Sequence, residues 1–103
     1  LVVGDLNGNV VWDRPRTNNF MSTVSMLDDA GLASAYHCVR AEAYGKESRG
    51  TLHLHRDKAK PYHIDYVFIP QAWTGRIRRV LVGEYEQWRP YSDHCPVVVE
   101  LLL

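Results

Sequence analysis

Apolar residues gather in uninterrupted runs along this chain, a pattern typical of strands that are buried on both faces. Three runs are clear, at positions 1–3, 67–69 and 97–103, and the second belongs to a strand predicted over 62–69. Gly4 follows the first run and Pro70 follows the second, and both residue types tend to end a strand. Because both faces of such strands must be covered, we expect a sheet with a helix on one face and a further layer on the other.

Two other segments, at 51–55 and 76–82, have residue types that are typical of strands. Polar stretches at 46–50, 56–61 and 84–91 predict the loops between these elements. The order of strands and helices is therefore mixed, which indicates an α/β fold.

Apolar residues at helical spacing predict one long helix that ends near Ala30. Its apolar positions recur every three or four residues: Phe20, Val24, Leu27 and Ala30. Three consecutive residues can cap its N-terminus: Thr17, Asn18 and Asn19. Gly31 suits the position just after the helix. A second helix is predicted over 35–44, with Ser34 as its cap and Gly45 at its end.

Composition indicates an ordinary globular domain. The chain has 103 residues, of which 46% are hydrophobic and 23% are charged, so it forms one domain at most. Twelve basic residues balance twelve acidic ones, so net charge points to no particular partner. No apolar stretch approaches the ~20 residues that a membrane helix needs. Cys38 and Cys95 are too few for a disulfide framework, which favours a reducing compartment such as the cytoplasm.

Both ends of the chain lie inside apolar runs. Domain termini are usually polar and loosely ordered, whereas this sequence opens with Leu-Val-Val and closes with Leu-Leu-Leu. We therefore expect these residues to be part of a longer protein. The open face of the sheet would then be covered by the absent sequence or by a second copy of the chain.

Asp5 and Asn7 stand just after the first predicted strand, two residues apart. On an extended backbone they would point to the same side. A carboxylate and an amide oxygen are hard ligands that suit Mg²⁺, which also keeps waters and binds phosphate. The alternative is a turn in which Asp5, Asn7 and Asn9 bond their own backbone.

Asp65 is the one acid in a strongly apolar predicted strand, and Asp93 and His94 stand side by side where the last strand begins. A buried carboxylate needs a hydrogen-bond partner. If that partner is His94, Asp65 fixes its tautomer and leaves the other ring nitrogen free for substrate. Asp93 is then free to face a metal ion. The alternative is an arginine partner, which would make Asp65 half of a structural ion pair.

Three short motifs, in this order, resemble those of the C-terminal half of the endonuclease/exonuclease/phosphatase family, which includes exonuclease III-type and DNase I-like nucleases. The motifs are Gly4-Asp5-Leu6-Asn7, Ile64-Asp65-Tyr66 and Ser92-Asp93-His94. The family fold is a four-layer α/β/β/α sandwich. The resemblance implies that residues 1–103 supply half of that sandwich, as one mixed, mainly antiparallel sheet with helices on its outer face.

The resemblance also implies a phosphoester hydrolase that depends on Mg²⁺ or Mn²⁺. Asp5 would orient or deprotonate the attacking water, and Asn7 would hold that water or the scissile phosphate. His94, held by Asp65, would stabilise charge on a phosphate oxygen. Asp93 would belong to the metal site, together with Asp5 and Asn7. The family takes a further Asn and a metal-binding Glu from its first half, so the chain alone is expected to be inactive.

Substrate contacts are expected from the loop that enters the strand of Asp65. That loop combines basic residues with an aromatic, which suits phosphate neutralisation and stacking on a base. Together with one arginine after the first motif, the candidates are Arg14, Arg56, Lys58, Lys60 and Tyr62. The alternative for the loop is a solvated hairpin tip.

The expected substrate is a phosphate ester. A nuclease is the first candidate, with nucleic acid as its partner. Three alternatives stay open: an inositol phosphatase, a phospholipase of the sphingomyelinase type, and a non-catalytic fragment that associates with itself. The residues shared within the family handle the phosphate and leave the rest of the substrate undefined.

Overall fold

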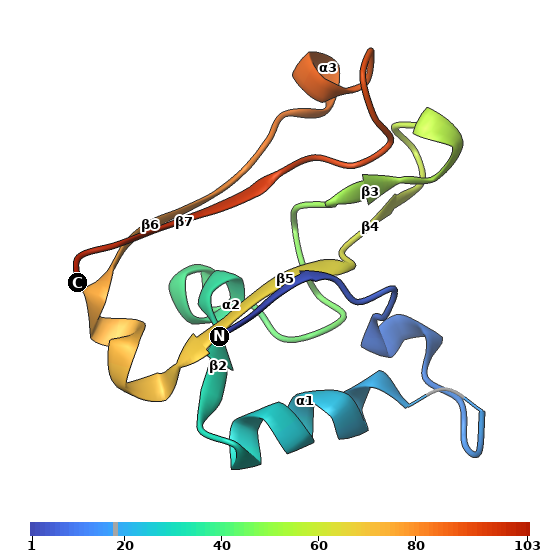
Figure 1. The fold of residues 1–103 in the computed structure, drawn as a ribbon. Coiled ribbons are helices and arrows are strands. Elements are labelled where there is room, and N and C mark those ends of the chain that lie inside the picture. Colours follow the sequence, from blue (N-terminus) through green and yellow to red (C-terminus); the bar gives the residue numbers. More distant parts are fainter. Residues whose placement is uncertain (18) are drawn as a thin grey trace.

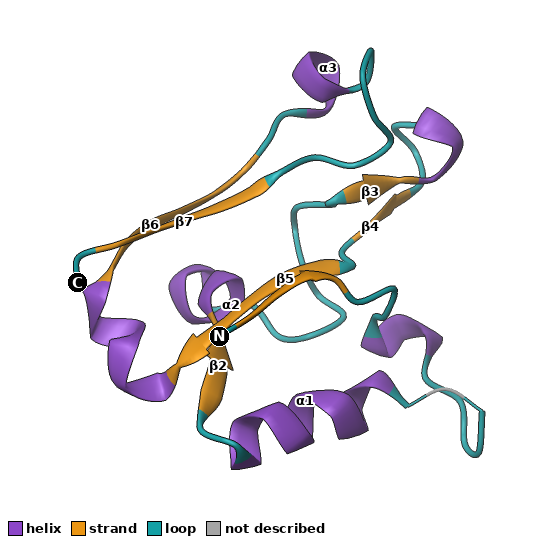
Figure 2. Cartoon of the chain, in the orientation of Figure 1, coloured by secondary structure: helices purple, strands orange, loops and turns teal. Residues whose placement is uncertain are grey.

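The computed structural model describes residues 1–17 and 19–103 and shows helices packed against antiparallel strands (Figure 1). The strands are β1 (Val2–Asp5), β2 (Leu32–Ser34), β3 (Leu52–His53), β4 (Pro61–Tyr62), β5 (Asp65–Pro70), β6 (Ile77–Val82) and β7 (Val97–Leu101) (Figure 2). The α-helices are α1 (Phe20–Asp29), α2 (Ala35–Arg40) and α3 (Tyr85–Trp88). Short 3-10 helices cover Val10–Trp12, Leu54–Arg56 and Gln71–Arg76. The predicted α/β class is confirmed.

β5 is the central strand of the structure. It pairs antiparallel with β1 on one side and with β2 on the other. Two further antiparallel pairs, β3–β4 and β6–β7, form separate sheets. The prediction of one mixed sheet is therefore wrong for the described residues. The 3-10 helix Gln71–Arg76 turns the chain after β5, and β6 then pairs with β7 instead of extending the central sheet.

α1 begins where its first N–H groups find acceptors. Asn19 is the cap, and its side chain accepts a hydrogen bond from a first-turn N–H at 3.0 Å. Asp13 accepts from two more, at 2.6 and 3.0 Å. These bonds satisfy donors that a helix leaves unpaired at its start. Of the three predicted caps Asn19 is confirmed, Thr17 lies before the cap, and Asn18 falls outside the described residues.

The buried face of α1 is the one that the apolar spacing predicts. Phe20 and Val24 pack with Tyr66 and Phe68 of β5. Gly31 takes a left-handed φ of 81° just after the helix, a conformation that glycine adopts at little cost. The helix is therefore fixed by its cap, its apolar face and its C-terminal glycine together.

α2 is shorter than predicted. The helix expected over 35–44 ends at Arg40, because Ala41 takes a left-handed φ of 53°. The Ser34 side chain does not cap it, and its hydroxyl contacts the Nδ1 atom of His37 at 2.7 Å instead. A side-chain contact three residues along the chain has replaced the expected cap.

Three further elements differ from the predictions. The strand expected over 51–55 is reduced to the two residues of β3, because His55 and Arg56 both take a left-handed φ of 57°. β2 is a three-residue strand that pairs with the second half of β5. α3 is one turn inside the predicted loop 84–91. Elements as short as β2 and α3 contain too few residues to show a periodic pattern.

Both faces of β5 are covered, as its continuous apolar run predicts. Tyr66 and Phe68 face α1, whereas Ile69 belongs to a second cluster formed with residues of α2 and β6. The layer expected from outside the chain is thus supplied in part by the chain itself. β1 is covered less completely than β5. Its Val3 lies opposite Val67, on the same side of the sheet as Ile69, and is 60% exposed.

The molecule is flat, with extents of 39 × 37 × 20 Å. Packed layers lie about 10 Å apart, so its thin dimension accommodates about two layers. Val3, Leu81 and Val98 are among the large apolar side chains that stay exposed. None of the helices in the described part of the chain has the length and apolar character that crossing a membrane requires.

Candidate functional site

Two carboxylates face each other at one end of the central sheet. Asp5 is the last residue of β1 and Asp65 is the first residue of β5, and the antiparallel register places them directly opposite. Like charges in opposite positions repel each other. A cation or an imidazolium is therefore expected beside this pair.

His94 lies against the two carboxylates. Its Nδ1 is 2.9 Å from Asp65 Oδ2, and its Nε2 is 3.9 Å from Asp5 Oδ2. An ionised carboxylate can only accept, so Nδ1 carries a proton and donates it to Asp65. The predicted hydrogen bond between Asp65 and His94 is present. No arginine forms an ion pair with Asp65 within residues 1–17 and 19–103.

Neighbouring backbone holds His94 in this position. His94 lies opposite Leu52 in an isolated antiparallel bridge. Its N–H donates to Ser92 Oγ at 3.0 Å. The imidazole is therefore placed by contacts on its own segment and by a contact with β3.

Three acids surround the imidazole of His94 and set its pKa. Partial burial alone would lower the pKa, but the hydrogen bond with Asp65 and the charges of all three acids outweigh it and raise the pKa above its usual value. The third acid is Asp93, whose Oδ1 lies 3.9 Å from His94 Nε2. Both Asp93 and Asp5 are thus beyond hydrogen-bond distance of Nε2, which leaves this nitrogen free to donate to another group.

The side chains around His94 suit a hard divalent cation. Asp5, Asp65 and His94 each offer one ligand atom, and these atoms lie within 4.8 Å of one another. Asp65 Oδ2 and His94 Nδ1 already bond each other, which leaves the carboxylate of Asp5 and the second oxygen of Asp65 as possible ligands. Asp93 is not a member of this group, although its Oδ1 lies 3.9 Å from His94 Nε2. Mg²⁺ commonly takes one or two protein carboxylates and keeps several waters. The carboxylates around His94 therefore offer the type of ligand that this ion takes.

The backbone at Asn7 differs from the extended conformation that the sequence predicted. β1 ends at Asp5, and Asn7 has a φ of 50°, so the backbone between them is not extended. Asn7 N donates to Asp5 Oδ1 at 2.8 Å, which is the turn of the alternative interpretation. The Asn7 side chain is exposed and makes no hydrogen bond to a described residue. Among the described residues, the only hydrogen bond between Asn7 and the site is the one from its backbone N–H to Asp5.

The predicted substrate residues do not converge on the imidazole. Lys58 forms an ion pair with Glu86 of α3, and its ammonium group lies over the Tyr85 ring. Tyr62 packs against Trp12, with ring centroids 4.9 Å apart. Both side chains are thus engaged within the chain.

The other three basic candidates are Arg14, Arg56 and Lys60. They are exposed, and none of the ion pairs formed within the described residues includes them. The hairpin tip at 54–60 packs against α3, where Tyr85 Oη donates to the Arg56 carbonyl at 2.7 Å. Only the base of this hairpin, at Leu52, adjoins His94. A solvated tip describes this geometry better than a substrate-binding rim.

A buried ion pair lies outside the residues that the sequence pattern indicated. Glu47 and His37 are 2.7 Å apart, with side chains only 4% and 7% exposed. Glu47 also accepts hydrogen bonds from Asn9 Nδ2 and from Gly45 N. Burial alone would raise the pKa of Glu47, but the hydrogen bonds donated to it outweigh burial and lower the pKa to about 2. The segment 46–50, predicted as a polar linker, thus contains a buried charge.

Asn9 connects this ion pair to the candidate site. It is buried, its Oδ1 accepts from Val11 N at 3.0 Å, and its Nδ2 also donates to His63 O at 2.8 Å. The side chain therefore ties the loop that follows Asp5 to the segment that precedes Asp65. An asparagine in a turn is too common for the sequence to reveal this role.

We expect Glu47→Ala to lower the free energy of unfolding by about 3–5 kcal/mol, because it leaves buried donors without an acceptor. Urea denaturation measures this loss. The matched control is Glu86→Ala, which breaks the ion pair with Lys58 between two largely exposed side chains, and it should leave the free energy of unfolding nearly unchanged because water screens exposed ion pairs. Equal losses in the two variants would contradict the assignment of Glu47 as a stabilising buried charge.

The same carboxylate predicts a pH dependence of stability. The pKa of Glu47 is lowered in the folded chain from an ordinary 4.5 to about 2. Its contribution is therefore fully present above pH 4.5 and is lost as the pH falls toward 2. The Glu47→Gln variant should lose less stability than the unsubstituted chain over this interval.

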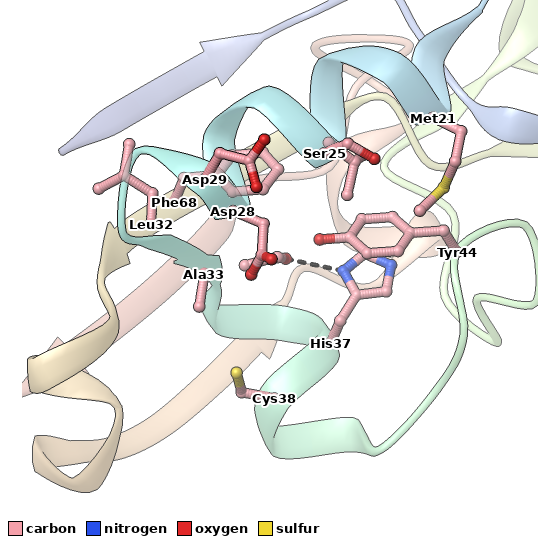
Figure 3. A pocket seen from close by; sticks show the side chains of 12 residues that line it. Met21, Ser25, Asp28, Asp29, Leu32, Ala33, His37, Cys38, Tyr44 and Phe68 are labelled. Carbon is pink, nitrogen blue, oxygen red and sulfur yellow. Dashed lines mark hydrogen bonds between the residues drawn. The ribbon is translucent and has the colours of Figure 1, made fainter.

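Two hollows lie on opposite faces of the central sheet. The first, of about 470 Å³, lies between α1 and α2, where the rings of His37 and Tyr44 stack 3.9 Å apart (Figure 3). The second, of about 370 Å³, is lined by Asp65 and His94 together with apolar residues of β1, β5 and β7. The first hollow is also lined by a histidine and two acids, His37, Asp28 and Asp29, but both ring nitrogens of His37 already contact Ser34 and Glu47. At the second hollow no acid among the described residues lies within hydrogen-bond distance of His94 Nε2, so this nitrogen can act on another group. The candidate chemistry therefore lies at the smaller hollow.

Neither a comparison with known protein families nor one with curated proteins finds a match to this chain. The site is therefore interpreted from its own geometry. That geometry is an imidazole held by one carboxylate, with two further carboxylates near its second nitrogen.

Proposed function

We propose that this chain is the C-terminal half of a metal-dependent phosphoester hydrolase of the endonuclease/exonuclease/phosphatase family, with a nuclease as the first candidate. The observation that carries the proposal is the His94 imidazole, which bonds Asp65 through one nitrogen and faces Asp5 with the other. The three motifs that resemble the family come from separate parts of the chain. The fold brings an acid or an imidazole from each of them to one place.

His94 Nε2 is the group that would contact the substrate phosphate. As an imidazolium it would donate to a non-bridging oxygen, where negative charge develops. Asp65 would keep the ring oriented and offset its charge. Asp5 Oδ2 would orient the attacking water and take its proton, while its Oδ1 is held by the N–H of Asn7. A Mg²⁺ or Mn²⁺ ion held by Asp5 and Asp93 would neutralise phosphate charge.

We further propose that another layer covers the sheet face that carries Val3, as in a four-layer α/β/β/α sandwich. The thin dimension of 20 Å and the exposure of Val3 support this arrangement. The absent half, or a second copy, would supply the layer, and the absent half would add the metal-binding Glu. The chain alone is then inactive. Both cysteines are free thiols, which supports a reducing compartment such as the cytoplasm.

The test of the function is an assay of the parent protein on DNA, RNA, an inositol polyphosphate and sphingomyelin vesicles. We expect hydrolysis of one of these classes in the presence of Mg²⁺. EDTA should abolish it and added Mg²⁺ should restore it, because the ion offsets charge in the transition state. The class that is hydrolysed separates the nuclease from the phosphatase and the phospholipase.

Failure on every substrate would contradict the proposal. It would favour the alternative of a non-catalytic fragment that associates through its exposed apolar face. Sedimentation of the chain alone would then show dimers or larger species.

A further inference from the structure

Thr51 is a polar residue with no exposed surface, and it lies between the two segments that carry Asp65 and His94. We propose that Thr51 is the positioning residue of the Asp65–His94 pair and sets the distance between the two side chains. The inference rests on the proposed function for its catalytic consequence, and on hydrogen bonds alone for its structural part.

The side chain of Thr51 holds the backbone of Asp65. Its Oγ1 accepts from Ile64 N at 3.0 Å and from Asp65 N at 3.1 Å. A hydroxyl oxygen has two lone pairs and can accept from both donors at once. The Thr51 N–H donates to the Tyr62 carbonyl at 2.9 Å. The residue is thus bonded on both sides of the turn that leads into β5.

The backbone of Thr51 and its neighbours holds His94. The Thr51 carbonyl accepts from Cys95 N at 2.7 Å. Two residues later His53 N donates to the Asp93 carbonyl, also at 2.7 Å, and Leu52 lies opposite His94 between them. Residues 51–53 therefore form a short ladder with residues 93–95. Thr51 belongs to this ladder and also bonds Asp65, so a shift of Thr51 changes the geometry of the pair.

Threonine suits this position for two reasons. Its branched side chain has restricted rotation, which fixes the direction of the hydroxyl. The hydroxyl also satisfies two N–H groups that valine, with nearly the same shape, would leave unpaired. Serine keeps the acceptor and loses only a methyl group. Thr51→Val and Thr51→Ser therefore separate the hydrogen bonds from the packing.

The first measurement is the imidazole Nδ1–H resonance of His94 in the isotope-labelled chain at fixed pH. In the unsubstituted chain the hydrogen bond with Asp65 should protect this proton from exchange. We expect the signal to be lost in Thr51→Val and retained in Thr51→Ser. The matched control is Thr74→Val, which removes a threonine hydroxyl bonded to the Gln71 carbonyl, and it should leave the signal unchanged.

The second measurement is kinetic, in the parent protein. Misplacing a reacting group by about 1 Å costs about 10²-fold in rate, so kcat should fall by about that factor in Thr51→Val, with little change in KM. Thr51→Ser should recover most of the rate. A merely structural role would reduce the amount of folded protein and leave the kcat of the folded fraction unchanged, and that result would overturn the inference.

Two outcomes keep the inference separate from the proposed function. If the parent hydrolyses no phosphoester but the His94 signal still follows the Thr51 variants as described, the function fails and the positioning role stands. If hydrolysis occurs and Thr51→Val leaves both the signal and kcat unchanged, the positioning role fails and the function stands.

A third measurement covers the case in which Thr51→Val does not fold. Amide exchange of Ile64 and Asp65 in the unsubstituted chain should be slow, because both N–H groups donate to the buried Thr51 hydroxyl. Exchange at the rate of exposed amides would overturn the inference.

Discussion

A His94→Ala variant of the parent protein is expected to hydrolyse its phosphoester about 10²–10⁴-fold more slowly, the usual contribution of a positioned acid or base. His94 Nε2 is able to donate to an anionic oxygen, because neither Asp5 nor Asp93 lies within hydrogen-bond distance of it. Its removal also leaves Asp5 and Asp65 facing each other without a partner between them. The loss should appear in kcat more than in KM, because the charge it offsets develops in the transition state.

His55→Ala is the matched control for this substitution. His55 lies exposed on the hairpin tip, so its loss should leave the rate close to that of the unsubstituted protein. The His94 side chain is itself about one-third exposed, so its truncation should not unfold the domain, and circular dichroism checks this. A His94 variant with the unsubstituted rate would remove the catalytic assignment.

Some elements could be predicted from sequence because the spacing of their own apolar residues reveals which face is buried. α1 shows helical spacing because Phe20 and Val24 lie on the face that packs on β5. β5 shows a continuous apolar run because α1 covers one of its faces and α2 the other. Each pattern of apolar residues reflects which side chains are buried in the folded chain.

The elements that could not be predicted depend on partners far along the chain. β2 is a strand only because it pairs with β5. α2 stops at a left-handed Ala41, a conformation that alanine rarely adopts and that no residue type signals. The pairing of β6 with β7 alone follows from the turn at Gln71–Arg76. None of these features shows in the local pattern of apolar and polar residues.

The residues in and near the site also separate into those that the sequence could predict and those that it could not. Asp65 could be predicted to meet His94 because a carboxylate in an apolar strand must find a donor. The prediction for Asn7 assumed an extended backbone beyond Asp5, whereas β1 ends at Asp5 and Asn7 has a left-handed φ. Glu47 could not be found, since its three donors come from three separate segments.

An Asp5→Asn variant tests the metal and the water together. The amide oxygen of asparagine can keep the hydrogen bond from Asn7 N, so the turn should persist while the charge near His94 is lost. We expect hydrolysis by the parent to fall by about 10²–10⁴-fold, because Asp5 would both take a proton and bind the ion. The binding of Mn²⁺, followed by the broadening of nuclear magnetic resonance signals around His94 in the chain itself, should weaken as well.

Asp29→Asn is the control, because Asp29 is an exposed acid on α1 that belongs to neither the metal cluster nor any ion pair within the described residues. Removal of one surface charge by this control should leave both the rate and the Mn²⁺ affinity unchanged. Unaltered Mn²⁺ affinity in Asp5→Asn would place the metal on other ligands. A slow Asp5→Asn variant with intact affinity would then restrict Asp5 to the water, since a carboxylate that binds no ion can still accept a proton.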